Sequence, residues 1–353
     1  MLFWRRGVSQ KSLFWQDLEG FCASKVQAFL LTAVLNKVLT TGYIRNQGYD
    51  ASNQVTHVEQ MGGESIGCPG NAGAAGTFFD ATLLSLRVGN DNVTTQTETP
   101  LLDFPTSPLW SNVFVENNAK VLVPLLWTRV QVRGQFSILR GGSISFGLSD
   151  YPISEFELVA EELLMSDSII KVYGAFRMAV KMLLMWNSKI QIDGEENTIV
   201  TTSVLEVRNL IVLRECSVIS SNANLWVYGQ GLLRLTGHGD AIQGQRLFLS
   251  LFYNITVGPG SLLQAPLDVE TGRTLVTKSH CESQTCPVDL ITPPDDCHVN
   301  NTLSFSLQIC RVEDLTVNGL VKGSILHIHR ARTVIVDTGG VISASELGDP
   351  ASS

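Results

Sequence analysis

Four of the seven cysteines lie close together near the C-terminal end of the chain, and their chemistry is the first to consider. They are Cys281, Cys286, Cys297 and Cys310. The cluster contains no CxxC pair, so its spacing does not suit a structural zinc site, and we expect disulfide bonds whose pairing stays open. The surrounding stretch KSHCESQTCPVDLITPPDDCHVN has no hydrophobic periodicity and predicts a disulfide-stapled loop. Cys310 falls on the strand face opposite Leu307 and Ile309, where a loop cysteine could reach it.

Three Asn-X-Thr triplets are candidate glycosylation sites, at Asn92, Asn254 and Asn300. Asn300 lies inside the cysteine cluster. Disulfides and N-glycans both belong to an oxidising, extracytoplasmic compartment, which we therefore predict for this chain. The sequence nevertheless contains no apolar run of transmembrane length and no clear signal peptide at its N-terminus.

The stretch TGHGD at residues 236–240 contains the clearest candidate for acid-base chemistry. It is similar to the GHG element of polygalacturonases, in which a His assists paired aspartates. The further elements that such enzymes need do not occur in the required order, since Asp295 and Asp296 come after His238 and lie in the cysteine loop. We therefore expect His238 to lie in an exposed turn and assign no catalytic residue.

Two further histidines, His327 and His329, are two residues apart in a strand-like stretch and share a face. No third metal ligand is near them in the sequence, so we predict two solvated histidines and no metal or other cofactor.

The composition favours a protein with a large core and a polar, weakly charged surface. Of 353 residues, 44% are hydrophobic and only 16% are charged, against roughly a quarter in an average protein. The net charge is −8 and no basic run exceeds two residues, which argues against nucleic-acid binding. From Leu83 onward, short stretches alternate apolar and polar residues and end near Gly, Asn or Asp, as β-strands do.

A repeated stretch defines how these strands are arranged. LLMSDSIIKVYG at residues 163–174 recurs as LLMWNSKIQIDG at residues 183–194. An offset of this size suits one coil of a parallel β-helix, or β-solenoid. Stacking the copies places Leu163 over Leu183, Ser168 over Ser188, Ile170 over Ile190 and Val172 over Ile192. We expect degenerate copies at residues 125–134, 211–220 and 247–258, and we interpret residues 155–165 and 175–186 as strands with tight corners.

Alternation along these coils sends a set of polar side chains outward. If residues 125–134 share the frame of the repeat, these side chains form one stripe, the predicted binding surface. Its members are Arg129, Gln131, Arg133, Lys171, Tyr173, Lys189, Gln191 and Asp193. The stripe contains no carboxylate cluster for calcium.

The predicted organisation has four parts. Residues 1–60 form an atypical N-terminal extension with a short amphipathic helix, since apolar residues recur at helical spacing from Leu18 to Val38. Residues 61–280 form an all-β, parallel β-helix with irregular coils. Residues 281–310 form the cysteine-rich loop, and residues 311–353 form the final solenoid strands and a truncated tail.

Much of the chain resembles a known family. GCPGNAGAAGTFFDA, residues 101–135, residues 154–189 and residues 307–345 resemble a plant family of very large glycine-rich, membrane-anchored secretory-pathway proteins whose function is undefined. The resemblance runs from about Gly62 to Ser345 and implies a signal peptide, solenoid segments and C-terminal membrane spans. Residues 1–60 and the ending ELGDPASS depart from the family pattern, so we expect a truncated or mis-assembled product whose membrane attachment lay in missing segments.

Three functional hypotheses follow from the sequence. The chain is a non-enzymatic, wall-facing β-solenoid whose stripe binds an anionic cell-wall polysaccharide or a partner protein. Alternatively, it is a β-helix hydrolase or lyase acting on a pectin-like substrate, or a purely structural segment of a larger membrane protein. The missing catalytic elements favour the first and third hypotheses.

Overall fold

The computed structural model describes most of the chain after the N-terminal region. It covers Gly62, residues 72–101, 110–125, 129–151, 154–196, 199–267 and 276–277, Cys297 and residues 305–344. All of them belong to one compact unit, Glu59–Ser353. The expected N-terminal helix and the extension at residues 1–60 lie outside the described residues.

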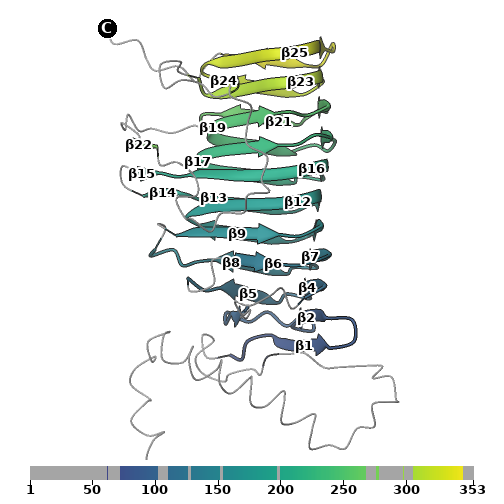
Figure 1. Ribbon diagram of the computed structural model, residues 1–353, viewed down its shortest axis with the longest axis vertical. Coiled ribbons are helices and arrows are strands. Elements are labelled where there is room, and N and C mark those ends of the chain that lie inside the picture. Colours follow the sequence, from purple (N-terminus) through teal and green to yellow (C-terminus); the bar gives the residue numbers. More distant parts are fainter. Residues whose placement is uncertain are drawn as a thin grey trace, which may run out of the picture. The chain divides into compact units, whose positions relative to one another are not determined.

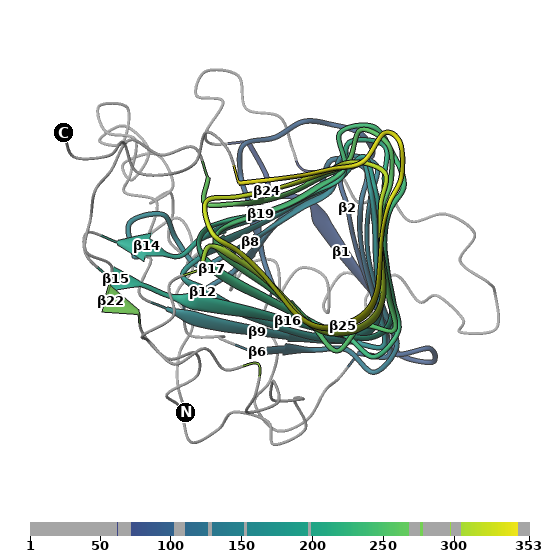
Figure 2. The same cartoon turned by 90° about the horizontal axis from the view of Figure 1, so that it is seen from above.

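Within the described residues the chain is all-β and forms a parallel β-solenoid of about nine turns, which confirms this part of the predicted fold (Figure 1). Seen along the stack, each coil has three sides (Figure 2). We call these sides sheets 1, 2 and 3, and the chain follows them in the order 3, 1, 2 in each coil. The strands are joined in parallel to those of the coils before and after.

Sheet 1 is on the right in Figure 2. It contains β2 (Ser85–Gly89), β4 (Asn112–Glu116), β7 (Gln135–Leu139), β10 (Glu162–Ser166), β18 (Leu232–Leu235), β20 (Asn254–Val257) and the second halves of β12 (Ala175–Trp186), β16 (Thr202–Arg214), β23 (Leu307–Val317) and β25 (Leu326–Val336). At its start, β1 (Gly76–Asp80) pairs antiparallel with β2.

Sheet 2 follows sheet 1 in each coil. It contains β3 (Thr99–Pro100), β5 (Lys120–Val123), β8 (Ser143–Phe146), β11 (Ile169–Tyr173), β13 (Lys189–Asp193), β21 (Leu262–Ala265), β24 (Leu320–Gly323), β26 (Val341–Ser343) and the first halves of β17 (Val218–Tyr228) and β19 (Ala241–Ser250).

Sheet 3 contains β6 (Arg129–Gln131), β9 (Glu155–Val159), the first halves of β12, β16, β23 and β25, and the second halves of β17 and β19. A separate small sheet joins β14 (Glu195–Glu196), β15 (Ile199–Val200) and β22 (Val276–Thr277). Because β23 begins at Leu307, the final solenoid strands start before the predicted boundary at residue 311.

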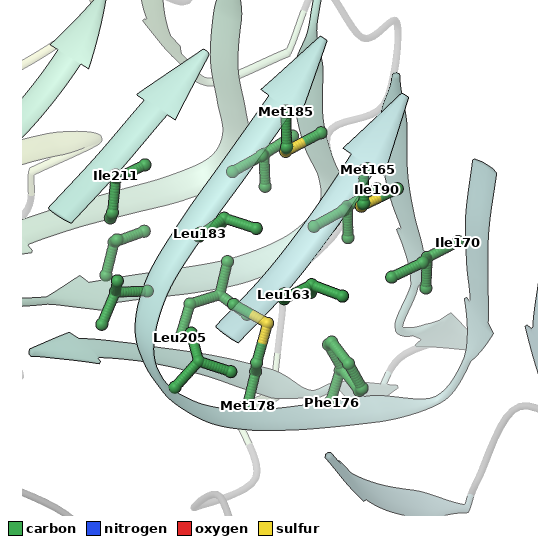
Figure 3. Close-up of a cluster of buried hydrophobic side chains, with 14 of the residues drawn as sticks. Leu163, Met165, Ile170, Phe176, Met178, Leu183, Met185, Ile190, Leu205 and Ile211 are labelled. Atoms are coloured by element: carbon green, nitrogen blue, oxygen red, sulfur yellow. The ribbon is translucent and has the colours of Figure 1, made fainter. Parts of the chain in front are cut away.

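The core is a set of columns of identical or similar residues, one column for each sheet. Alternation along a strand turns every second side chain inward, and parallel pairing stacks like on like. All the following residues are fully buried. Sheet 1 contributes Phe136, Leu163, Leu183, Ile211, Leu233, Ile255 and Leu315; sheet 2 contributes Ile144, Ile170, Ile190, Ile219, Ile242 and Leu263; sheet 3 contributes Leu158, Met178, Leu205, Val227, Leu249 and Ile309 (Figure 3).

The register of the sequence repeat is confirmed. Leu163 pairs with Leu183, and Ile170 pairs with Ile190. Residues 175–186 are one bent strand, β12, which crosses from sheet 3 to sheet 1 near Val180, where its pairing with β16 shifts register. The bend lets a single strand serve two sides of a coil.

One of the three degenerate copies is placed correctly. Residues 211–220 follow the repeat, since Ile211 pairs with Leu183 and Ile219 with Ile190. The prediction for residues 125–134 is wrong, because Val130 pairs with Leu158 on sheet 3 and the true preceding copy begins at Phe136. Residues 247–258 are also out of frame, with Leu247 on sheet 3 and Ile255 on sheet 1. Alternating apolar residues occur on all three sheets, so a short match does not identify the sheet.

Candidate functional site

The outer face of sheet 2 carries five of the eight predicted binding residues together. Lys171 pairs with Gln191, and Tyr173 pairs with Asp193, on adjacent strands β11 and β13. Lys189 pairs with Ile169 on the same face. Lys171, Lys189 and Gln191 are exposed, whereas Tyr173 and Asp193 are half-buried. The face therefore offers cationic, amide and hydroxyl groups side by side.

The polar surface extends over further coils, which sequence reasoning missed. The column that contains Lys171 runs through polar residues in five successive coils. We call it the Lys171 row, and it consists of Ser145, Lys171, Gln191, Ser220 and Gln243. Beyond Gln243 the same column continues through Gln264, Lys322 and Ser343. The missed residues lie in coils that only the strand register aligns, because the corner lengths differ from coil to coil.

Charged neighbours determine the state of the groups beside the row. Burial raises the pKa of the Tyr173 hydroxyl, and the negative charges of Glu98 and Asp193 raise it further. Tyr173 is therefore a neutral hydrogen-bond donor at neutral pH. Asp193 Oδ1 accepts a hydrogen bond from Asn222 Nδ2 at 2.5 Å, and Ser145 Oγ donates to Glu98 Oε1 at 3.4 Å. These contacts fix the side chains around the two lysines.

The remaining three predicted residues do not belong to this face, so the expected single stripe is corrected. Arg129 and Gln131 lie on β6 in sheet 3, and Arg133 lies in the exposed corner between sheets 3 and 1. Arg129 Nε is 3.0 Å from Glu157 Oε2, so this guanidinium is engaged by a neighbouring carboxylate. The correction has the same cause as the misplaced copy at residues 125–134, a frame that fits more than one sheet.

The corner between sheets 1 and 2 explains the TGHGD stretch. Asp240 is fully buried, and its carboxylate accepts hydrogen bonds from the backbone N–H groups of Ser217 and Thr236, each at 3.0 Å, and of Gly237. His238 is exposed, as predicted, and its ring lies against Gly260. The carboxylate nearest to His238 in sequence is thus committed to holding a backbone corner.

The histidines of the last coil also lie as predicted on one face. His327 and His329 project from β25, and their rings stack with centroids 5.5 Å apart. Gln308 Nε2 lies 3.0 Å from His327 Nδ1. Within the part of the chain that the structure describes, no group of three His, Cys, Asp or Glu side chains is placed to hold a metal ion.

The predicted disulfide and glycosylation residues are partly described. Cys310 projects outward from sheet 3 and forms a disulfide with Cys297, which fixes one of the open pairings. Cys281, Cys286 and Asn300 lie outside the described residues. Asn92 is exposed in a turn, whereas Asn254 lies half-buried in β20, where its Oδ1 accepts a hydrogen bond from Thr256 Oγ1 at 2.7 Å.

Comparisons of this chain with family models, curated proteins and solved structures gave no match. The resemblance to the plant glycine-rich family and the predicted compartment therefore stay predictions. None of the described residues forms a helix that is long and apolar enough to span a membrane.

Proposed function

We propose that the described solenoid is an extracytoplasmic segment of a larger membrane-anchored protein, and that it acts there as a non-enzymatic binding scaffold for a cell-wall polysaccharide. The observation that carries this proposal is the Lys171 row. A continuous polar column on one sheet face repeats its donors and acceptors once per coil, roughly every 4.8 Å. An extended chain of sugar residues also repeats its hydroxyl groups at regular intervals, so successive coils can contact successive sugars.

The side chains of this face suit a polysaccharide. Lys171 and Lys189 can pair with carboxylates of an anionic wall polymer, and Gln191 can both donate to and accept from hydroxyl groups. Tyr173 adds a hydroxyl donor beside them. Lys171, Lys189 and Gln191 are all exposed, so the surface is accessible without rearrangement of the coil.

The alternative of a pectin-cleaving enzyme receives no support from the geometry around His238. A hydrolase of that kind needs paired carboxylates near the His, and the Asp240 carboxylate already accepts three backbone hydrogen bonds. His238 therefore has no carboxylate partner from its own corner.

The binding role is tested with immobilised wall polysaccharides of known charge. We expect the whole chain to bind one or more of them, and the double variant Lys171→Ala, Gln191→Ala to bind about tenfold more weakly because a charge-assisted and a neutral hydrogen bond are lost. Lys181→Ala is the matched control, since Lys181 is an exposed lysine on a different corner that pairs with Glu161. Absence of binding by the unmodified chain, or equal binding by the double variant, would overturn the proposal.

A further inference from the structure

A second surface, distinct from the Lys171 row, contains an open cleft of about 600 Å³ at the corner between sheets 3 and 1, the lower right corner in Figure 2. The cleft crosses four successive coils. Its charged and polar lining consists of Gln230, Tyr253, Arg311, Glu313, Arg330 and Arg332. Three guanidinium groups thus face one carboxylate in a chain whose net charge is −8.

The strand register stacks the charges of this cleft. Cys310 pairs with His329 and Val312 pairs with Ala331, so Arg311 lies directly over Arg330. Both residues adopt left-handed backbone conformations, with φ of 53° and 55°, which turn their side chains out of the corner. Like charges on neighbouring strands repel each other, and a bound anion between the two coils would relieve that repulsion.

The coil before the arginines leaves room for a ligand. Its corner reads Gly229-Gln230-Gly231, so only Gln230 contributes a side chain to the lining. A Cβ at Gly231 would lie 1.7 Å from the carbonyl oxygen of Asn209, and one at Gly229 would lie 2.4 Å from Phe252 Cε1. The close stacking of the coils therefore requires glycine at both positions, and the cleft is a consequence of it.

The other side chains indicate which anion fits. Tyr253 is 60% exposed and presents an aromatic ring beside the arginines. Glu313 Oε2 lies 3.0 Å from Arg332 Nη1 and can also accept hydrogen bonds from hydroxyl groups. A ligand that carries carboxylates, hydroxyl groups and a flat C–H face uses all of these groups, whereas Glu313 would repel a densely charged phosphate chain.

We propose that this cleft binds an acidic oligosaccharide, with uronate carboxylates held by Arg311 and Arg330 and one sugar ring packed on Tyr253. Four coils at roughly 4.8 Å spacing span about 15 Å, enough for a short run of sugar units. Arginine suits this role because its planar fork can donate two parallel hydrogen bonds to a carboxylate. The proposal does not depend on the Lys171 row.

The test is calorimetric titration of the whole chain with an oligogalacturonate, a neutral cello-oligosaccharide of the same length and inorganic sulfate. We expect binding of the oligogalacturonate that weakens with salt, and no binding of the neutral sugar. The double variant Arg311→Gln, Arg330→Gln should lose about tenfold or more in affinity. Arg234→Gln is the matched control, since Arg234 is an exposed arginine on the outer face of sheet 1, and it should change affinity less than twofold.

The remaining arms separate the alternatives. Tyr253→Ala should weaken oligogalacturonate binding several-fold and leave any sulfate binding unchanged. The variant Lys171→Ala, Gln191→Ala should keep full affinity in this cleft, so failure of the Lys171 row proposal is distinguishable. Sulfate binding as tight as oligogalacturonate binding, no oligogalacturonate binding, or unchanged affinity of the arginine double variant would each overturn the proposal, provided that thermal unfolding shows the variants to be folded.

Discussion

At the scale of single residues, the polar groups buried in the corner between sheets 1 and 2 have structural roles. Ser188 Oγ accepts a hydrogen bond from the backbone N–H of Ser168, and Ser217 Oγ accepts one from that of Ser188. Asp240 continues the series by accepting from the backbone N–H of Ser217. Each polar side chain satisfies the backbone of the preceding coil, where the strand ladder is interrupted.

Asp240 is therefore predicted to matter for stability. Removing its carboxylate leaves three buried N–H groups without an acceptor, and hydrogen bonds to charged groups contribute about 1.5–3 kcal/mol each before partial compensation. We expect Asp240→Ala to lower the free energy of unfolding by at least about 2 kcal/mol in urea denaturation. Asp150→Ala, which changes an exposed aspartate, should stay within about 0.5 kcal/mol. Equal stability of the two variants would contradict this role.

Glu157 on the outer face of sheet 3 leads to a pH prediction. Burial raises the pKa of its carboxyl, and the charges of Arg129 and Arg177 offset this only in part. A raised folded-state pKa means that the unfolded chain gives up the proton first, so stability is fully present below the unfolded pKa, near 4.5, and falls as the pH rises through the folded pKa.

The variant Glu157→Gln lacks this titration. The free energy of unfolding of the variant, relative to the unmodified chain, should increase as the pH rises above about 4.5 and level off beyond the folded pKa. Urea denaturation at a series of pH values measures the difference. A difference that stays constant over the series shows that the carboxyl titrates alike in both states.

At the scale of elements, each strand divides its residues between core and surface. In β12, Leu183 is fully buried in the sheet 1 column, whereas its neighbour Leu184 faces outward and is half-buried. Both leucines belong to the sequence repeat, so identity between the copies alone does not separate them. The pleat of the strand does, because successive side chains point to opposite faces.

Paired alanine substitutions test this division. Leu183→Ala should lower the free energy of unfolding by about 2–5 kcal/mol, since it opens a cavity in a closely packed column. Leu184→Ala should cost about 1 kcal/mol or less, because its side chain already contacts solvent. Chemical denaturation of the two variants measures both values, and a larger cost for Leu184 would mean that the register is shifted by one residue.

At the scale of the whole solenoid, burial depends on the place of a coil in the stack. Leu315 and Val317 on β23 are fully buried, whereas Val334 and Val336, at the same positions in the next coil, are 44% and 47% exposed. A coil is buried only where coils lie on both of its sides. The same residue type in the same column therefore contributes differently to stability.

Val317 and Val336 allow a direct comparison. Val317→Ala should lower the free energy of unfolding by about 1.5–3 kcal/mol, and Val336→Ala by about half of that or less, because nearly half of its side chain is exposed before the change. Thermal or urea unfolding measures both. Equal costs would indicate that the last described coil is covered by another surface in solution.

The amino-acid sequence by itself determined the parallel solenoid, the register of its repeat and the pairing partner side of Cys310. These follow from local alternation and from two nearly identical neighbouring copies, which need no knowledge of distant contacts. Only the tertiary structure decided which residues share an outer face. The corners between strands vary in length, so Ser145 and Gln243 align with Lys171 only through hydrogen bonds between coils, while Arg129 and Arg133 leave that face. The arginine cleft is likewise invisible in the sequence, because Gly231, Arg311 and Arg330 meet only after an insertion has been bridged by stacking of the coils.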